Sequence, residues 1–166
     1  MKSITNKTVS MKPIYLILPA FLLMALGACN NSGIKPKEGS DSQKAMADSL
    51  QDQVIAGHDA GMAKTRLISR AKKEAERLID SINKLPAKAR EAAKPYKIKL
   101  DSLISHLDNA SLAMDKWMEE FNFDSAKNNL EQRIKYLTEE KIKVGKVKEA
   151  ILGSLQKADS VIKSKF

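Results

Sequence analysis

Three long segments of the chain carry apolar residues at three- and four-residue intervals, the spacing of one face of an α-helix. The main apolar positions are Val54, Ile68, Ala71, Ala75, Leu78, Ile79 and Ile82, then Leu100, Leu103, Leu107, Ala110, Met114, Trp117 and Phe121, then Leu130, Ile134, Leu137, Val144, Val147, Ile151, Leu155, Ala158 and Ile162. Alternating β-branched runs, which indicate strands, are absent. Each stripe covers one face only, so each helix needs partners. The pattern predicts an all-α fold, an antiparallel three-helix bundle of coiled-coil-like character over residues 44–166.

Proline and capping residues suggest where these helices end. We expect helices over about 45–84, 95–121 and 125–163, with Leu85 and Pro86 stopping the first. Pro95 either begins the second helix or kinks one that started after Pro86, and we favour a break or kink at 94–96. Polar residues after the second helix are candidates to cap the third, namely Asn122, Asp124 and Ser125.

The N-terminal segment has the three parts of a secretory signal. Lys2, Lys7 and Lys12 come without an acidic residue, an apolar stretch covers 14–26, and small residues follow. The run Leu-Gly-Ala-Cys at 26–29 suits lipoprotein signal peptidase, so we predict a signal peptide over 1–28, cleaved before Cys29. Ordinary secretion with a chance cysteine is the alternative. Met11 is an alternative start that leaves the mature protein unchanged.

Cys29 is the only cysteine, so it has no partner for an intramolecular disulfide. A diacylated, N-acylated cysteine would anchor the protein stably in a lipid bilayer. The following residues, up to about position 43, are rich in Ser, Gly, Asn and Lys, which predicts a flexible tether over 29–43. We therefore expect a protein of the cell envelope, with the periplasmic side of the outer membrane favoured over the cell surface or the inner membrane.

Basic residues exceed acidic ones, but they are spread over all three helical segments. Losing the three lysines of the leader lowers the formal net charge from +9 to +6. Such a balance favours anionic lipid headgroups or acidic glycans, and export argues against nucleic acid as a partner. Because the lysines alternate with Glu and Asp, they are best explained as solvated helix faces.

Two short boxes carry a resemblance to a known family. The first is His-Asp-x-x-Met-x-Lys at 58–64, and the second is Met-x-x-Trp-Met-x-x-Phe at 114–121, with the run 139–144 also fitting. The chain resembles a family of small Bacteroidota lipoproteins often labelled "viral A-type inclusion protein", a label that reflects coiled-coil similarity. Thr65 departs from the pattern, because relatives commonly have Met there, and Ala60 and Ala63 replace frequent Glu and Pro. The resemblance implies a helical, lipid-anchored protein and no particular activity.

The fold would bring the two boxes close together. If the first two helices turn back around 85–90, position 58 lies level with about 112–120. The cluster would then combine one imidazole, up to three thioethers and an indole, from His58, Met62, Met114, Met118 and Trp117. Imidazole and thioether ligands suit Cu(I) or Ag(I), so a soft-metal site is one hypothesis.

Packing is the competing explanation for the same residues. Met, Trp and Phe at helical spacing most often belong to a core. Gly57 and Gly61 could open a notch in which Trp117 packs, with His58 bonded to a carbonyl or carboxylate and Asp59 pointing the other way. We expect packing rather than a bound cofactor.

An enzyme is the least supported class of function. His58 and His106 are the only histidines, and no Gly-rich phosphate loop, His-Glu-x-x-His motif or second cysteine is present. The leading hypothesis is a lipid-anchored, non-enzymatic interaction or spacer module that binds an unidentified envelope protein or a second copy of itself.

Overall fold

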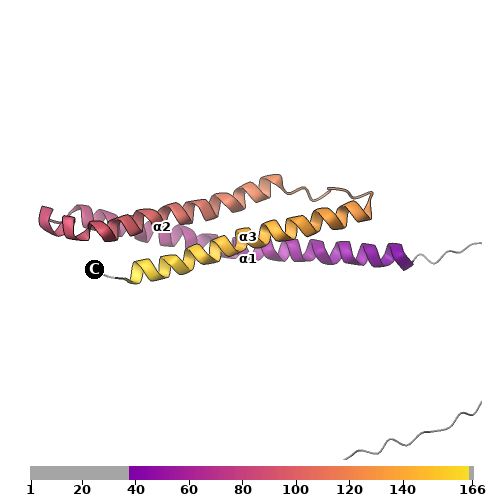
Figure 1. Cartoon of the computed structure of the whole chain (residues 1–166), viewed down its shortest axis with the longest axis horizontal. Coiled ribbons are helices and arrows are strands. Elements are labelled where there is room, and N and C mark those ends of the chain that lie inside the picture. Colours follow the sequence, from indigo (N-terminus) through magenta and orange to yellow (C-terminus); the bar gives the residue numbers. More distant parts are fainter. Residues whose placement is uncertain (1–37, 165–166) are drawn as a thin grey trace, which may run out of the picture. The chain divides into compact units, whose positions relative to one another are not determined.

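The computed structural model describes residues 38–164, which form three long helices packed side by side. These are α1 (Glu38–Asn83), α2 (Ala87–Glu120) and α3 (Leu130–Lys163), and α2 runs opposite to the other two (Figure 1). A three-residue turn joins α1 to α2, and a loop over 121–129 joins α2 to α3. Helices are the only regular elements of the described residues, so the predicted all-α three-helix bundle is confirmed.

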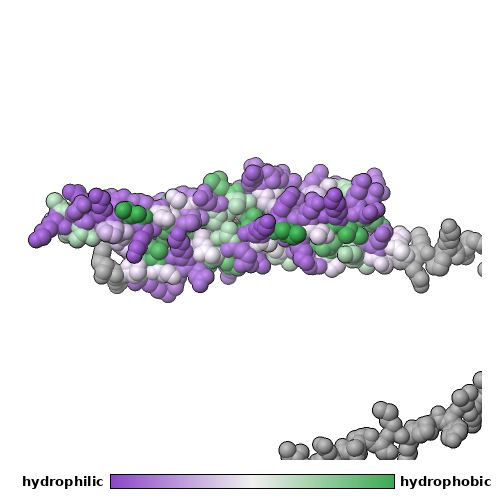
Figure 2. All heavy atoms as spheres, in the orientation of Figure 1, coloured by the Kyte–Doolittle hydropathy of each residue, from purple (hydrophilic) through white to green (hydrophobic). Residues whose placement is uncertain are grey.

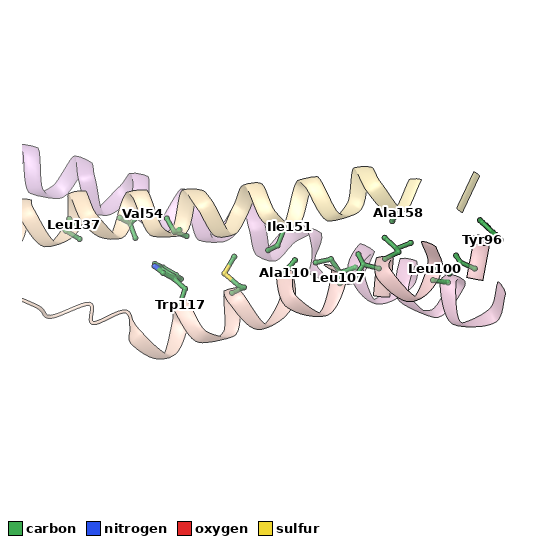
Figure 3. Packing of buried hydrophobic residues seen from close by; sticks show 14 of the residues in the cluster. Val54, Tyr96, Leu100, Leu107, Ala110, Trp117, Leu137, Ile151 and Ala158 are labelled. Carbon is green, nitrogen blue, oxygen red and sulfur yellow. The ribbon is translucent and has the colours of Figure 1, made fainter. Parts of the chain in front are cut away.

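The apolar stripes face one another along the bundle axis and form one continuous core (Figure 3). The largest fully buried side chains come from all three helices, namely Val54, Ile82, Leu100, Leu103, Leu107, Met114, Leu137, Val144 and Ile151. Burying one such side chain stabilises the fold by roughly 1.5–3 kcal/mol. The visible outer face is mostly hydrophilic, with separate apolar spots (Figure 2). The core therefore accounts for the amphipathic pattern of the sequence.

The first helix begins earlier than the sequence pattern predicts. It starts at Glu38 instead of 45, so residues 38–43 of the expected tether are helical, and residues 29–37 of that tether lie outside the described part of the chain. Ala47 and Leu50 are buried and fix the next turns, from which the helix extends towards the N-terminus. Acidic Asp41 favours the start of the helix through the helix dipole. These exposed turns lack apolar residues, so periodicity could not reveal them.

The second helix starts at Ala87 and continues through Pro95, so the predicted start at 95 is wrong and the helix does not break at 94–96. The stretch 87–93 is rich in Ala, Lys, Arg and Glu, all strong helix formers. Pro95 cannot donate an N–H to the carbonyl of Glu91. Both residues are exposed, so water can hydrate that carbonyl. A helix that begins after Pro86 was the alternative, and it is the one observed.

The third helix begins at Leu130, five residues later than expected. Its N-cap is Asn129, whose Oδ1 accepts a hydrogen bond from the Gln132 N–H at 3.0 Å. The candidate cap Asn122 instead accepts from the Asp124 N–H at 2.9 Å, within the loop. Such local side-chain bonds give the backbone an alternative to a helix. None of the three predicted residues is the N-cap. The cap is Asn129, the polar residue directly before the apolar stripe.

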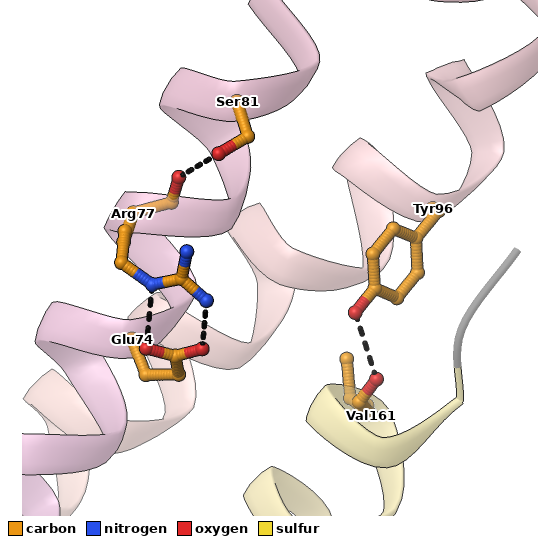
Figure 4. A network of polar contacts seen from close by, with 5 residues as sticks. All are labelled: Glu74, Arg77, Ser81, Tyr96 and Val161. Atoms are coloured by element: carbon orange, nitrogen blue, oxygen red, sulfur yellow. Dashed lines mark hydrogen bonds and ion pairs between the residues drawn. The ribbon is translucent and has the colours of Figure 1, made fainter.

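A few polar contacts tie the helices together. Lys72 of α1 donates to Asp108 of α2 at 2.7 Å, and this bond raises the pKa of Lys72. The Tyr96 hydroxyl of α2 donates to the Val161 carbonyl near the end of α3 at 3.2 Å (Figure 4). Within the described residues, every buried side-chain nitrogen and oxygen has a hydrogen-bond partner. The buried polar atoms of the bundle are therefore hydrogen-bonded, just as its apolar side chains are packed in the core.

Candidate functional site

His58, Trp117 and Met118 meet where α1 passes the C-terminal end of α2. His58 Nε2 lies 3.3 Å from Met118 Sδ, and the His58 and Trp117 ring centroids are 5.7 Å apart at 35°. These three residues line a surface hollow of about 130 Å³ together with Ile55 and Phe121. The hairpin of α1 and α2 therefore brings the first box of the sequence against the second.

The other nitrogen of His58 has a charged partner. His58 Nδ1 lies 2.9 Å from a carboxylate oxygen of Asp59, the next residue in α1. The expectation that Asp59 points away from the imidazole is therefore wrong, whereas the expected carboxylate partner is present. The His58 side chain is 25% exposed, so it sits at the edge of the core with access to solvent.

Met62 and Met114 occupy different environments from Met118. Met114 is 1% exposed, and its methyl group lies only 2.4 Å from the position that a Cβ on residue 61 would take if Gly61 were replaced. Met62 is 37% exposed and, like Met114, does not line the hollow at His58. Of the four sulfur and nitrogen ligands suggested by the sequence, the structure brings only His58 and Met118 into contact in that hollow.

Gly57 and Gly61, which flank His58, leave space for side chains other than the indole of Trp117. A Cβ on Gly57 would meet Val144 of α3 at 2.9 Å, and one on Gly61 would meet Met114. The notch therefore exists, but the prediction that Trp117 fills it is wrong. Close approach of α3 to α1 requires a residue without a side chain at position 57.

Trp117 is held from the inside of the bundle by a carboxylate that the sequence analysis missed. Its indole N–H donates to Glu140 Oε2 at 2.9 Å, and Lys143 donates to Glu140 Oε1 at 2.7 Å (Figure 3 shows Trp117 directed inward). The hydrogen bond to Glu140 raises the pKa of Lys143. Glu140 is 3% exposed. Its position, three residues after Leu137 and four before Val144, was a detectable signal, because it places a charge within the apolar stripe.

Aromatic rings continue from Trp117 towards the loop. Phe121 stacks on Trp117 with centroids 4.9 Å apart and on Tyr136 with centroids 6.1 Å apart, and Phe123 meets its edge. The Tyr136 hydroxyl accepts a hydrogen bond from the Asn122 N–H at 2.7 Å. Burial raises the pKa of Tyr136. The end of α2 is therefore fixed against α3 by a row of rings.

Arg133 is a second polar residue within the stripe of α3 that the sequence analysis missed. Its guanidinium donates to the carbonyls of Phe123 and Ser125 at 3.2 and 2.8 Å, and also to Gln51 of α1. Arg133 is buried, so these bonds satisfy its charge within the bundle. This single side chain joins the loop between α2 and α3 to the first helix.

His106 does not belong to the cluster around His58. It is exposed on α2, twelve residues before Met118, which corresponds to roughly 18 Å along the helix axis. Within residues 38–164, no group of three or more His, Cys, Asp and Glu residues is placed to hold a metal ion.

Cys29 and the predicted signal peptide lie outside the described residues. None of the described helices has a stretch long and apolar enough to span a bilayer. Comparison of the chain with protein-family models, curated proteins and solved structures gives no match. A functional proposal therefore rests on the residues of this chain.

Proposed function

We propose that this chain is a lipid-anchored protein whose helical bundle serves as a non-enzymatic spacer and interaction module in the cell envelope. The anchor is assigned to Cys29, on the basis of the basic leader, the apolar stretch and the Leu-Gly-Ala-Cys run. The outer membrane, facing the periplasm, is the proposed location.

The length of the helices is the observation that carries the spacer role. The 46 residues of α1 correspond to roughly 70 Å at 1.5 Å per residue. Helix α1 begins nine residues after Cys29, a stretch that reaches about 30 Å when fully extended. A bundle of this length, stiffened by a continuous core, would hold the turn at 84–86 far from its anchored end.

Exposed apolar side chains support the interaction role. Ile98 and Leu112 on α2 and Ile142 on α3 are more than half exposed. Ile98 and Leu112 are two heptads apart, so they share one face of α2. An envelope protein or a second copy of the chain that bound this face of α2 would cover both side chains.

The anchor is tested by comparing wild type with Cys29→Ser in cells. We expect the wild type to sediment with membranes and to incorporate labelled fatty acid, and the variant to lose both properties. Equal membrane association of the two proteins, without acyl mass on the wild type, would show that Cys29 is not the anchor. Protease treatment of intact cells tests the side of the membrane, and removal of the bundle would overturn the periplasmic location.

The interaction role is tested by cross-linking in cells and by sedimentation of the purified protein. We expect the double substitution Ile98→Lys, Leu112→Lys to abolish the cross-linked species without changing the helical circular dichroism signal. Arg66→Lys, on α1, serves as a matched surface control. A protein that stays monomeric and gives no cross-linked species even as wild type would refute this role while leaving the anchor intact.

A further inference from the structure

Two soft donor atoms from different helices face each other at the surface hollow near the end of α2. We propose that His58 Nε2 and Met118 Sδ bind a soft monovalent cation, Cu(I) or Ag(I), with Asp59 as the residue that orients the imidazole. The two atoms are 3.3 Å apart. This site is independent of the lipid anchor and of the spacer role.

Asp59 determines which nitrogen of His58 is free to bind the cation. A carboxylate accepts hydrogen bonds and cannot donate one, so the Asp59 oxygen at 2.9 Å places the proton of neutral His58 on Nδ1. The lone pair of Nε2 is then directed towards Met118 Sδ, which also carries only lone pairs. Such a carboxylate, bonded to the far nitrogen, is the usual orienting partner of a histidine that binds a metal.

The distance between His58 Nε2 and Met118 Sδ suits one ion bound to both atoms. With bonds as long as those of zinc, about 2.0 Å to nitrogen and 2.3 Å to sulfur, an N···S distance of 3.3 Å corresponds to an angle of about 100° at the metal. Such a bent pair leaves at least one coordination position unused. That position would open into the hollow lined by Ile55 and Phe121. The ion would fit with little movement of either helix.

The donor set selects for soft ions. Thioether and imidazole ligands favour Cu(I), whereas harder ions need carboxylate or carbonyl oxygens. Asp59 is engaged with Nδ1 of the ring, so it acts as an orienting residue instead of a ligand. The indole of Trp117 lines the same hollow, and its ring centre lies 5.7 Å from that of His58.

Met114 and Met118 differ in their exposure to solvent. Met114 is 1% exposed and fills the space above Gly61, whereas Met118 is 38% exposed. Neither Met62 nor Met114 lines the hollow, so the site has two protein ligands and not four.

Two ligands and an open position have a functional consequence. The bound ion would exchange readily with a donor from another molecule, because a third ligand can approach before either protein ligand leaves. Such a site suits transfer of the ion between partners better than storage.

The test is a titration of Ag(I) into the full chain carrying Cys29→Ser, which removes the only competing thiol. Trp117 is the single tryptophan, so its emission reports on this hollow alone. We expect saturable quenching at one ion per chain. Asp59→Ala should weaken the affinity by roughly tenfold to a hundredfold, as loss of an orienting partner does at other metal sites. His58→Ala and Met118→Leu should weaken it further.

Matched controls use the other histidine and the other exposed methionines. His106→Ala, Met46→Leu and Met62→Leu should bind Ag(I) as the parent does. Equal affinity in the parent and in Met118→Leu, or no saturable quenching of the parent, would refute the site. Loss of binding in Met62→Leu would overturn the two-ligand assignment. His58 and Met118 are both partly exposed, and unchanged helical circular dichroism in each variant would separate lost ligands from lost folding.

Discussion

The indole of Trp117 on α2 donates its N–H to the carboxylate of Glu140 on α3 at 2.9 Å, and both side chains are buried. The second oxygen of that carboxylate accepts a bond from Lys143 at 2.7 Å. The buried charge therefore has a partner on each oxygen. Trp117, His58 and Met118 line the same hollow. The bond to Glu140 therefore fixes the indole that lies beside the His58 and Met118 pair.

Removal of the Glu140 carboxylate should destabilise the bundle. Glu140→Leu leaves the buried Trp117 N–H without an acceptor, which we expect to lower the free energy of unfolding by about 1–3 kcal/mol. Glu140→Gln keeps an acceptor and should lose less. Urea unfolding followed by Trp117 emission measures both. The control is the exposed neighbour Glu139. The free energy of unfolding of Glu139→Gln should stay within about 0.5 kcal/mol of the wild-type value. A Glu140→Leu protein as stable as wild type would contradict the role of this bond.

Much of the fold could be predicted because apolar spacing records which face of a helix is buried. Val54, Leu107 and Ile151 lie in the predicted stripes and are fully buried. Helix ends were harder to predict, since exposed turns such as those at 39–44 leave no apolar signal. Pro95 suggests a break that does not form, because a proline on the exposed face of a helix removes a hydrogen bond that water can replace.

The candidate site was only partly predictable for a geometric reason. Residues four apart on a helix differ by about 40° in direction, since each residue turns by roughly 100°. That offset leaves Met114 inside the core and Met118 at its edge. Spacing alone groups the two methionines, and only the packing of the three helices separates them. Glu140 and Arg133 lie within the apolar stripe of α3, where a charged residue signals a buried polar partner.

Gly57 of α1 and the glycines of α3 should respond to alanine in opposite ways. A Cβ at Gly153 or Gly145 meets nothing within 4 Å, so alanine there should raise the free energy of unfolding by up to about 1 kcal/mol. A Cβ at Gly57 would lie 2.9 Å from the stiff Val144 side chain. Overpacking strain of about 1–3 kcal/mol should then outweigh the gain in helix propensity. Thermal unfolding of Gly57→Ala and Gly153→Ala makes the comparison, and a stabilised Gly57→Ala would show that the helices can move apart.

Replacing Pro95 by a residue that has a backbone N–H should stabilise α2. Pro95→Ala supplies an N–H for the Glu91 carbonyl and removes the clash of the ring with that turn, so we expect a gain of roughly 1–3 kcal/mol in the free energy of unfolding. Pro86→Ala is the matched control, because Pro86 precedes the helix and replaces no internal bond. A gain in both variants, measured by urea unfolding, would indicate an effect unrelated to the interior of α2.

Two of the three tyrosines should ionise at higher pH in the folded protein than in the unfolded chain. Burial is the main cause that raises the pKa of both Tyr96 and Tyr136 above the ordinary value of 10.0. Below that value both states carry neutral tyrosines and the free energy of unfolding is unaffected. Above it the unfolded chain loses protons that the folded bundle retains, so stability should fall as the pH rises beyond about 10.

Absorbance of tyrosinate during alkaline titration measures this effect directly. The native curve should lie at higher pH than the curve in urea, where all tyrosines ionise near their ordinary value. Tyr136→Phe should remove one of the raised steps while the step of Tyr96 remains, because the two hydroxyls have separate partners, the Asn122 N–H and the Val161 carbonyl. Native and unfolded curves that coincide would mean that both rings are open to solvent, and the stacked row from Trp117 to Tyr136 would then not be closed in solution.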